Sequence, residues 1–177
     1  SRAEILYYIK EEIATASIGQ EETVVNKCCE EIYFKTPHIN NEMINRSVVG
    51  TSQTRKARVN VIDAILKHAD DEQFYSGTSQ EATIYRALFV GTGIKNECAE
   101  NNIQEILCII NEFIDSCCDR KTTFTELITT LTKEPYGMRL GVIPFYLAYV
   151  MSKRKEDLVG YFSSMEIQID ADVVVNM

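Results

Sequence analysis

Two stretches of the sequence carry residues with which proteins bind phosphates or metal ions, but neither has the required spacing. Residues 89–95 contain two glycines and a lysine. A Walker loop needs G-x-x-x-x-G-K-[ST], and a dinucleotide-binding loop needs a third glycine after a strand. Because these glycines follow a predicted helix, we interpret them as a helix C-cap and turn. Residues 68–72 place a histidine near three acidic residues, and we interpret this run as a solvated helix end.

Nucleophilic catalysis needs a base beside the nucleophile, and histidine is the usual base. With only two histidines, His38 and His68, the chain offers no recognisable Ser-His-Asp or Cys-His arrangement. We therefore expect no catalytic function for this chain and no metal or cofactor.

The cysteines form two adjacent pairs and two single residues, which does not match the C-x-x-C spacing of a zinc knuckle. Most of them fall within apolar helical patterns, where a free thiol acts as a small hydrophobe. We therefore expect reduced, buried cysteines in a cytoplasmic protein, since reducing compartments keep thiols free. They are Cys28, Cys29, Cys98, Cys108, Cys117 and Cys118.

Basic residues cluster at the start of a predicted long helix and on both sides of a predicted helix near residues 144–153. In a winged helix, the third helix enters the major groove and its flanks touch phosphates. These basic residues are therefore our candidate contacts for DNA or for a partner protein. They are Arg55, Lys56, Arg58, Arg139, Lys153, Arg154 and Lys155. Residues 142–151 are nearly all apolar, however, whereas a DNA-reading helix exposes polar side chains. This observation favours a contact with a protein over a contact with DNA.

The composition places the 177-residue chain among globular proteins, with 45% hydrophobic and 25% charged residues. The 18 Lys and Arg residues against 26 Asp and Glu give a net charge of −8. This balance argues against a general nucleic-acid coat protein, although a local basic face remains compatible with it. We expect no membrane span and no signal peptide, because no apolar run is long enough. The chain lacks an initiator Met, and we expect it to be part of a larger protein.

Apolar residues at helical spacing predict a helical region over residues 1–100. A first helix is expected over 3–16 and a second, with Val24, Val25, Cys28, Ile32 and Tyr33 as its apolar stripe, up to Pro37. A long helix follows over 51–70. A capping box of Thr78 and Glu81 predicts another helix, which Gly91 and Gly93 stop.

Residues 101–177 follow the element order of a winged helix, namely helix, helix, turn, helix and β-hairpin. Asn101 or Asn102 is expected to cap an amphipathic helix that reaches Cys117, and Thr123 with Glu126 forms a second capping box. Pro144 suits the first turn of the next helix. The alternating residues 158–169 predict a hairpin around Ser163 and Ser164, and Asp170 can cap a last helix.

Two shorter segments invite both structural and functional interpretations. In residues 40–46 an ion pair between Glu42 and Arg46 would suit a helical turn. We favour a polar helix entry packed by its two apolar residues over a contact with another domain. In residues 136–144 we expect a structural turn, in which Gly137 adopts a left-handed backbone conformation and the Tyr136 hydroxyl finds a partner.

Three stretches resemble motifs of a known family. INNEMINRSVVGTSQTRKARVNVIDAIL and GTSQEATIYRALFVGTGI resemble the N-E-L-I-N-R … A-R-R … P-E … I-Y … T-G pattern of very large bacterial P-loop ATPases of bacteriophage-exclusion systems, the BrxC/PglY group. KEPYGMRLGVIPFYLAYVM is similar to their PPYGL-x-x-G-V-I-P-x-L-L-A motif. Glu134-Pro135 replaces the paired prolines, and Met43 and Met138 replace leucine. The resemblance implies a downstream, non-catalytic segment whose Walker motifs lie elsewhere in the parent protein.

These observations together predict a mainly α-helical chain with an N-terminal helical bundle over residues 1–100 and a winged-helix-like module over residues 101–177. The function that they favour is a regulatory or interaction module of a large defence-type ATPase. Its expected partner is the rest of that ATPase or another protein, with weak DNA contact through the basic flanks. The alternative is a free-standing winged-helix DNA-binding regulator.

Overall fold

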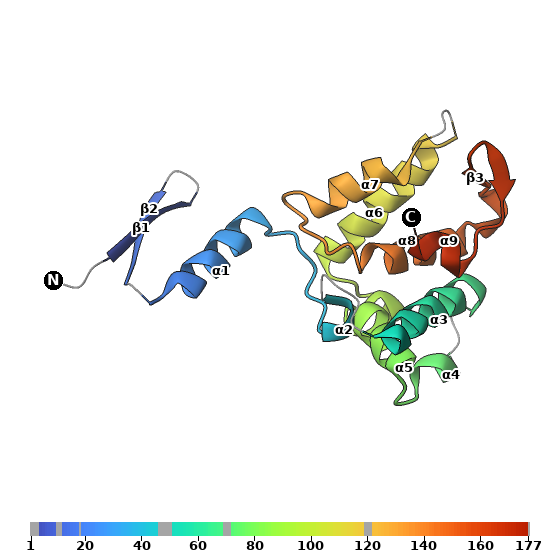
Figure 1. Ribbon diagram of the computed structural model, residues 1–177, viewed down its shortest axis with the longest axis horizontal. Helices are drawn as coiled ribbons and strands as arrows, with labels where there is room; N and C mark the ends of the chain where they lie inside the picture. Colours follow the sequence, from blue (N-terminus) through green and yellow to red (C-terminus); the bar gives the residue numbers. More distant parts are fainter. Residues whose placement is uncertain are drawn as a thin grey trace.

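The computed structural model describes residues 4–9, 12–17, 19–45, 51–68, 72–118 and 122–176. The chain is mainly helical, and strands occur in the described part as two separate two-stranded antiparallel hairpins. Figure 1 shows most of the helices gathered in one body, with the N-terminal hairpin and the first helix lying to one side. Within the described ranges, no helix is long and apolar enough to cross a membrane.

The N-terminal segment is a β-hairpin, so the helix predicted over residues 3–16 was wrong. Strand β1 (Glu4–Ile9) pairs antiparallel with β2 (Glu12–Ser17), and Ile5 lies opposite Ala16 in the register. The apolar residues of this segment satisfy a helical period, but residues 5–9 also form a short continuous apolar run, which fits a strand equally well. Isoleucine, tyrosine and threonine favour extended structure, and here that preference outweighs the helical spacing.

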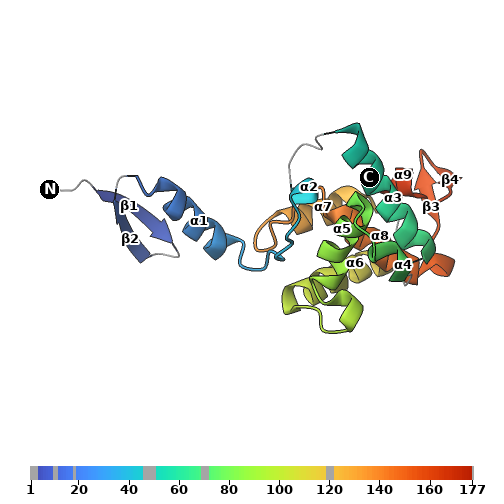
Figure 2. The ribbon, with the colours of Figure 1, turned by 90° about the horizontal axis from the view of Figure 1, so that it is seen from below.

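Helix α1 (Glu21–Ile32) ends earlier than predicted and does not bury its apolar stripe. Its C-cap is Tyr33, whose backbone N–H donates to the Cys29 carbonyl, four residues before Pro37. None of its side chains, all of them described, is buried. Both views show α1 extending away from the body together with the first hairpin (Figures 1 and 2). We call the hairpin and residues 19–34 the arm, and residues 36–176 the body.

The body contains the long helices that the periodicity predicted. Its elements are α2 (Glu42–Asn45), α3 (Ser52–His68), α4 (Glu72–Tyr75), α5 (Gln80–Tyr85), the π-helix η1 (Arg86–Val90), the 3-10 helix η2 (Ile94–Asn96), α6 (Asn101–Ser116), α7 (Phe124–Thr132), α8 (Ile143–Lys153), the 3-10 helix η3 (Lys155–Asp157), β3 (Gly160–Phe162), β4 (Met165–Ile167) and α9 (Ala171–Val175). The predicted hairpin at 158–169 is confirmed, with Ser163 and Ser164 at its turn in left-handed conformations.

Helix α8 lies at the centre of the body. It packs against α3, α6 and α9, and most of its side chains are buried, among them Phe145, Tyr146 and Leu147. The Phe89 ring meets the Tyr146 ring edge-on, with centroids 6.0 Å apart, which joins the π-helix to α8. One continuous hydrophobic core extends from Ile44 to Val174. The core therefore draws on residues from both sides of residue 100.

The helix caps differ from the predictions in three places. The side chain of Ser79, rather than Thr78, accepts the cap hydrogen bond, from the Ala82 N–H, at the start of α5. Helix α6 begins after Glu100 without a side-chain cap, so neither asparagine has the predicted role. Thr123 stands at the N-cap of α7 but makes no side-chain cap bond. Asp170 does cap α9, because its carboxylate accepts from the backbone N–H of residue 173.

The turn between α7 and α8 holds the base of the arm. Gly137 has a φ of +54°, as predicted, and a Cβ at this position would lie 2.6 Å from the Tyr33 ring. The Tyr136 hydroxyl donates to Glu105 Oε1 at 2.7 Å, and Lys35 Nζ lies 2.5 Å from the same oxygen. The Thr36 hydroxyl donates to the Tyr136 carbonyl. We call residues 33–36 with residues 133–138 the joint.

The short helix α2 behaves as a packed helix entry. Ile44 is fully buried and Met43 is half-buried. The amide Nδ2 of Asn45 donates to the Ile39 carbonyl at 2.7 Å. Arg46, the other member of the predicted ion pair with Glu42, lies outside the described residues.

Candidate functional site

The candidate site is an apolar groove of about 900 Å³ between the C-terminal hairpin, the end of α6 and the start of α7. Most of its lining side chains are aliphatic or aromatic, and Asp172 is the one charged residue among those lining it in the described chain. Side chains that line it include Phe113, Ile114, Cys117, Thr123, Phe124, Leu147, Met151, Leu158, Phe162, Ile167, Ile169, Asp172 and Val173. Mainly apolar concave surfaces with few polar groups are typical of binding sites.

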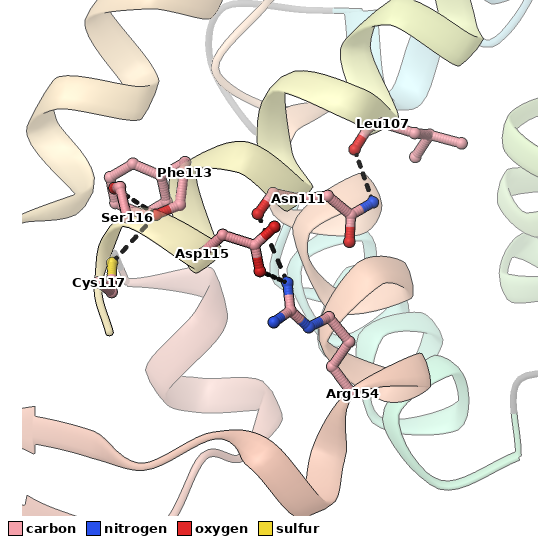
Figure 3. Close-up of polar contacts among 7 residues, drawn as sticks. All are labelled: Leu107, Asn111, Phe113, Asp115, Ser116, Cys117 and Arg154. Atoms are coloured by element: carbon pink, nitrogen blue, oxygen red, sulfur yellow. Dashed lines mark hydrogen bonds and ion pairs between the residues drawn. The ribbon is translucent and has the colours of Figure 1, made fainter. Parts of the chain in front are cut away.

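One ion pair fixes the hairpin side of the groove to α6. Arg154 follows α8, and its guanidinium lies 2.7 Å from the carboxylate of Asp115 near the end of α6. It also donates to the Asn111 carbonyl at 3.5 Å. Figure 3 shows Arg154 reaching across to the last turn of α6. Because the guanidinium makes these contacts, Arg154 positions the chain that leads into the hairpin.

The end of α6 forms the opposite wall. The hydroxyl of Ser116 and the thiol of Cys117 both donate to the Phe113 carbonyl, at 2.7 Å and 3.2 Å (Figure 3). These bonds satisfy a carbonyl that the helix end would otherwise leave without a partner. The Phe113 ring packs against the Phe124 ring with centroids 5.6 Å apart, which holds the start of α7 beside α6.

The hairpin beside the groove exposes large apolar side chains on both of its faces. Phe162 is 68% and Met165 67% exposed, and these residues lie opposite each other in the register. Tyr161 and Val159 are also more than half exposed. Exposed apolar side chains that gather beside a groove are typical of protein-interaction sites. The groove and these four residues together are the hairpin surface.

The first basic cluster lies at the other end of α8 from the hairpin. Arg58 is only 7% exposed, and its Nη2 donates to the Gly141 carbonyl at 2.8 Å. Its guanidinium lies 5.7 Å from the centroid of the Phe145 ring, and burial lowers the pKa of Arg58. The Arg139 guanidinium donates to the Asn45 carbonyl. Arg58 is therefore a structural residue that joins α3 to the start of α8.

Arg55 and Lys56 belong to this first cluster, but the predicted contact residues at the other end of α8 are separate from it. Arg55 and Lys56 are exposed on α3, and Lys56 lies near Glu81. Lys153 is the last residue of α8 and Lys155 follows the helix, and both are exposed. The Lys153 ammonium lies 5.6 Å from the centroid of the Tyr149 ring. The helix between the two groups is about 16 Å long at 1.5 Å per residue. The structure thus separates the basic residues into two groups.

The cysteines are free, but the prediction that they are buried was wrong. Cys28 is half-buried and the other five are exposed. Cys108 lies on the solvent side of α6, whose buried positions are taken by isoleucines, and Cys117 and Cys118 follow the end of that helix. In the described ranges, no group of three or more potential ligands could hold a metal ion.

Sequence reasoning identified the hairpin but missed the groove beside it. The available signal was the dipeptide Tyr161-Phe162 in a three-residue strand. Successive strand residues point to opposite faces, so two adjacent aromatic residues place apolar surface on both sides of the hairpin. Comparison of the chain with known protein families, curated proteins and solved structures gives no match.

Proposed function

We propose that the chain is a non-catalytic interaction module of a larger cytoplasmic protein, and that it binds a protein partner through the hairpin surface. The resemblance of residues 39–66, 77–94 and 133–151 to motifs of the BrxC/PglY group favours a bacterial defence-type ATPase as the parent. In this proposal residues 101–177 are a winged-helix-like module, since α6, α7, α8 and the β3–β4 hairpin follow in that order.

The burial of α8 is the observation that carries this proposal. In a DNA-reading winged helix, the third helix presents polar side chains to base edges. Here Ile143, Phe145 and Tyr146 open that helix and are buried, and the side chains of the following two turns are mostly buried as well. The helix therefore forms the centre of the core and is not available to read DNA. The neighbouring hairpin surface is the part of the module that a partner protein can contact.

The contacts between the resembling motifs support the idea that they form one unit. Arg58 from the first motif donates to the carbonyl of Gly141 in the last, and Arg139 from the last donates to the carbonyl of Asn45 in the first. Gly141 also lies so close to α2 that a Cβ there would stand 2.9 Å from the Ile44 carbonyl oxygen. Arg58, Arg139 and Gly141 of these motifs therefore hold α2 and α3 against the start of α8.

The test is association of the chain with the remainder of its natural reading frame, expressed separately and analysed by co-elution and by backbone hydrogen exchange. We expect protection of residues 158–169 and 122–125 in the complex. Phe162→Ser with Met165→Ser should abolish co-elution. Leu140→Ser removes an equally exposed apolar side chain at the other end of α8 and should leave co-elution intact. Association that survives the double substitution would contradict the proposal.

DNA binding is the competing outcome, because Lys153 and Lys155 are exposed beside the hairpin. A gel-shift titration at two salt concentrations measures it. With few phosphates neutralised, any binding should be weak and steeply salt-dependent. Tight DNA binding that Lys153→Ala with Lys155→Ala abolishes, and that Phe162→Ser with Met165→Ser does not affect, would favour the DNA-binding regulator instead.

A further inference from the structure

The arm exposes an apolar stripe that no element of the described body covers. Val25, Cys29 and Ile32 are spaced i, i+4 and i+7 along α1, so they lie on one face of the helix. Val25 is 57% and Ile32 45% exposed, and Cys29 is exposed as well. Tyr33 and Phe34 extend the apolar surface beyond the helix end. We call Val25, Cys29 and Ile32 the arm stripe.

The elements of the arm are short. A 12-residue helix such as α1 is at the lower limit of what is stable alone in water, and most helical stability comes from packing of an apolar face. A two-stranded hairpin such as β1–β2 is marginal by itself for the same reason. Contact with a further surface would therefore stabilise the arm, and the arm stripe is the face that such a surface would cover.

The charges of α1 define the chemistry of that surface. The helix carries Glu21, Glu22, Glu30 and Glu31 against a single lysine, Lys27. Glu21 and Glu22 lie one turn before Val25, at the start of the arm stripe. Opposite charges at the edge of an interface attract the correct partner, and like charges repel others. A surface that covers the arm stripe should therefore be apolar at its centre and basic at its edges.

The two described grooves of a second copy fit such a surface poorly, because acidic side chains line both of them, although Lys67 and Lys155 also line the groove beside α3. The net charge of the chain is −8, and the charged residue that lines its own apolar groove is Asp172. We infer that α1 is an acidic docking helix for a different protein, one with a basic-rimmed apolar groove or helix face. This site is separate from the hairpin surface and does not depend on the function proposed for it.

The test uses the full chain and two synthetic amphipathic helical peptides as probes. Both peptides carry leucine along one face, with lysine on both flanks in one peptide and glutamate in the other. Fluorescence anisotropy measures binding, and hydrogen exchange measures protection of residues 21–34. We expect the lysine peptide to bind, with protection of α1 and weakening by salt, and the glutamate peptide not to bind. Binding of both peptides alike would overturn the inference.

Substitutions then locate the binding site. Val25→Ser with Ile32→Ser should weaken binding of the lysine peptide by about tenfold or more, which is about 1.4 kcal/mol or more. Glu21→Gln with Glu22→Gln should weaken it less and should reduce the salt dependence. Phe162→Ser with Met165→Ser is the matched control on the hairpin surface and should leave binding unchanged. The inference is overturned if this control abolishes binding and the arm substitutions do not.

Two further measurements distinguish other occupants of the arm stripe. Sedimentation of the chain at increasing concentration should show a monomer. A dimer that Val25→Ser with Ile32→Ser dissociates would show that a second copy covers the stripe. Flotation with neutral phosphatidylcholine vesicles should show no binding, and binding to them that the same substitutions abolish would show that a lipid surface is the occupant. Either result would overturn the inference.

Discussion

Ile32 in the arm and Ile62 in the body are isoleucines on helices with the same apolar periodicity, but their surroundings differ completely. Ile62 lies in the middle of α3, which packs against α5, α8 and α9, and it is fully buried. Ile32 ends α1, beside which no described element of the body packs closely, and its side chain is 45% exposed. Periodicity thus shows that a helix has an apolar face. What covers that face depends on the rest of the chain or on a partner.

The largest difference in stability should appear when the isoleucine side chain is shortened once in the body and once in the arm. Ile62→Ala should lower the free energy of unfolding by about 2–5 kcal/mol, because it leaves a cavity in a close-packed core. Ile32→Ala is the matched variant and should change it by no more than about 0.5 kcal/mol. Urea denaturation followed by circular dichroism measures both. Equal losses for the two variants would show that the arm packs on the body in solution.

A smaller effect is expected at the joint. Gly137→Ala puts a Cβ against the Tyr33 ring and forces a side-chain residue into a left-handed conformation, which costs about 1–2 kcal/mol. At Gly77 a Cβ would meet only the Ser79 N at 4.0 Å, so Gly77→Ala should leave stability unchanged or raise it by up to about 1 kcal/mol. Thermal melts compare the two. Hydrogen exchange should also rise at residues 33–36 in the first variant only.

The smallest expected effect is a pH dependence of stability that arises from Tyr136 in the joint. Tyr146 in the core differs from it in the cause of its pKa shift. A hydrogen bond to Glu105, followed by burial, raises the pKa of Tyr136 from 10.0 to about 12. The folded state therefore holds the proton more tightly than the unfolded state. Its contribution to stability is fully present below pH 10 and is lost as the pH rises to about 12. In contrast, burial is the main cause that raises the pKa of Tyr146 in the core.

Tyr136→Phe removes this contribution and provides the measurement. The difference in unfolding free energy between the parent chain and the variant should be constant at neutral pH and should shrink between pH 10 and 12. The contributions of Tyr146 and the other tyrosines cancel in this difference. A difference that stays constant over that range would mean that the bond between Tyr136 and Glu105 does not form in solution.

The long helices could be predicted from the sequence because the spacing of their apolar residues fits a helix and no other regular structure. Ile103, Ile106, Ile110 and Ile114 recur on one face of α6 and are all buried. Pro144 and Asp170 have the positions that their chemistry favours, at the start of α8 and at the cap of α9. These are local preferences that agree with the tertiary structure, so they are visible in the sequence alone.

The arm and the groove could not be predicted because they depend on contacts between distant residues. The pattern of EILYYI fits both a helix and a strand, and the pairing with EIATAS decides between them. Whether Val25 is covered depends on the direction in which α1 leaves the joint. The groove is lined by residues from α6, α7, α8, the hairpin and α9, and spacing along the sequence does not reveal that these segments meet.

The position of α9 has a consequence for how the chain folds as it is synthesised. Ala171 and Val174 of α9 are buried, and the helix packs against both α3 and α8. Part of the α3 surface is therefore covered only by α9, which lies more than a hundred residues later in the sequence. Contacts between such distant residues form slowly, because a long loop must close first. We therefore expect the faces of α3 and α8 that α9 covers to stay exposed during synthesis until α9 has left the ribosome.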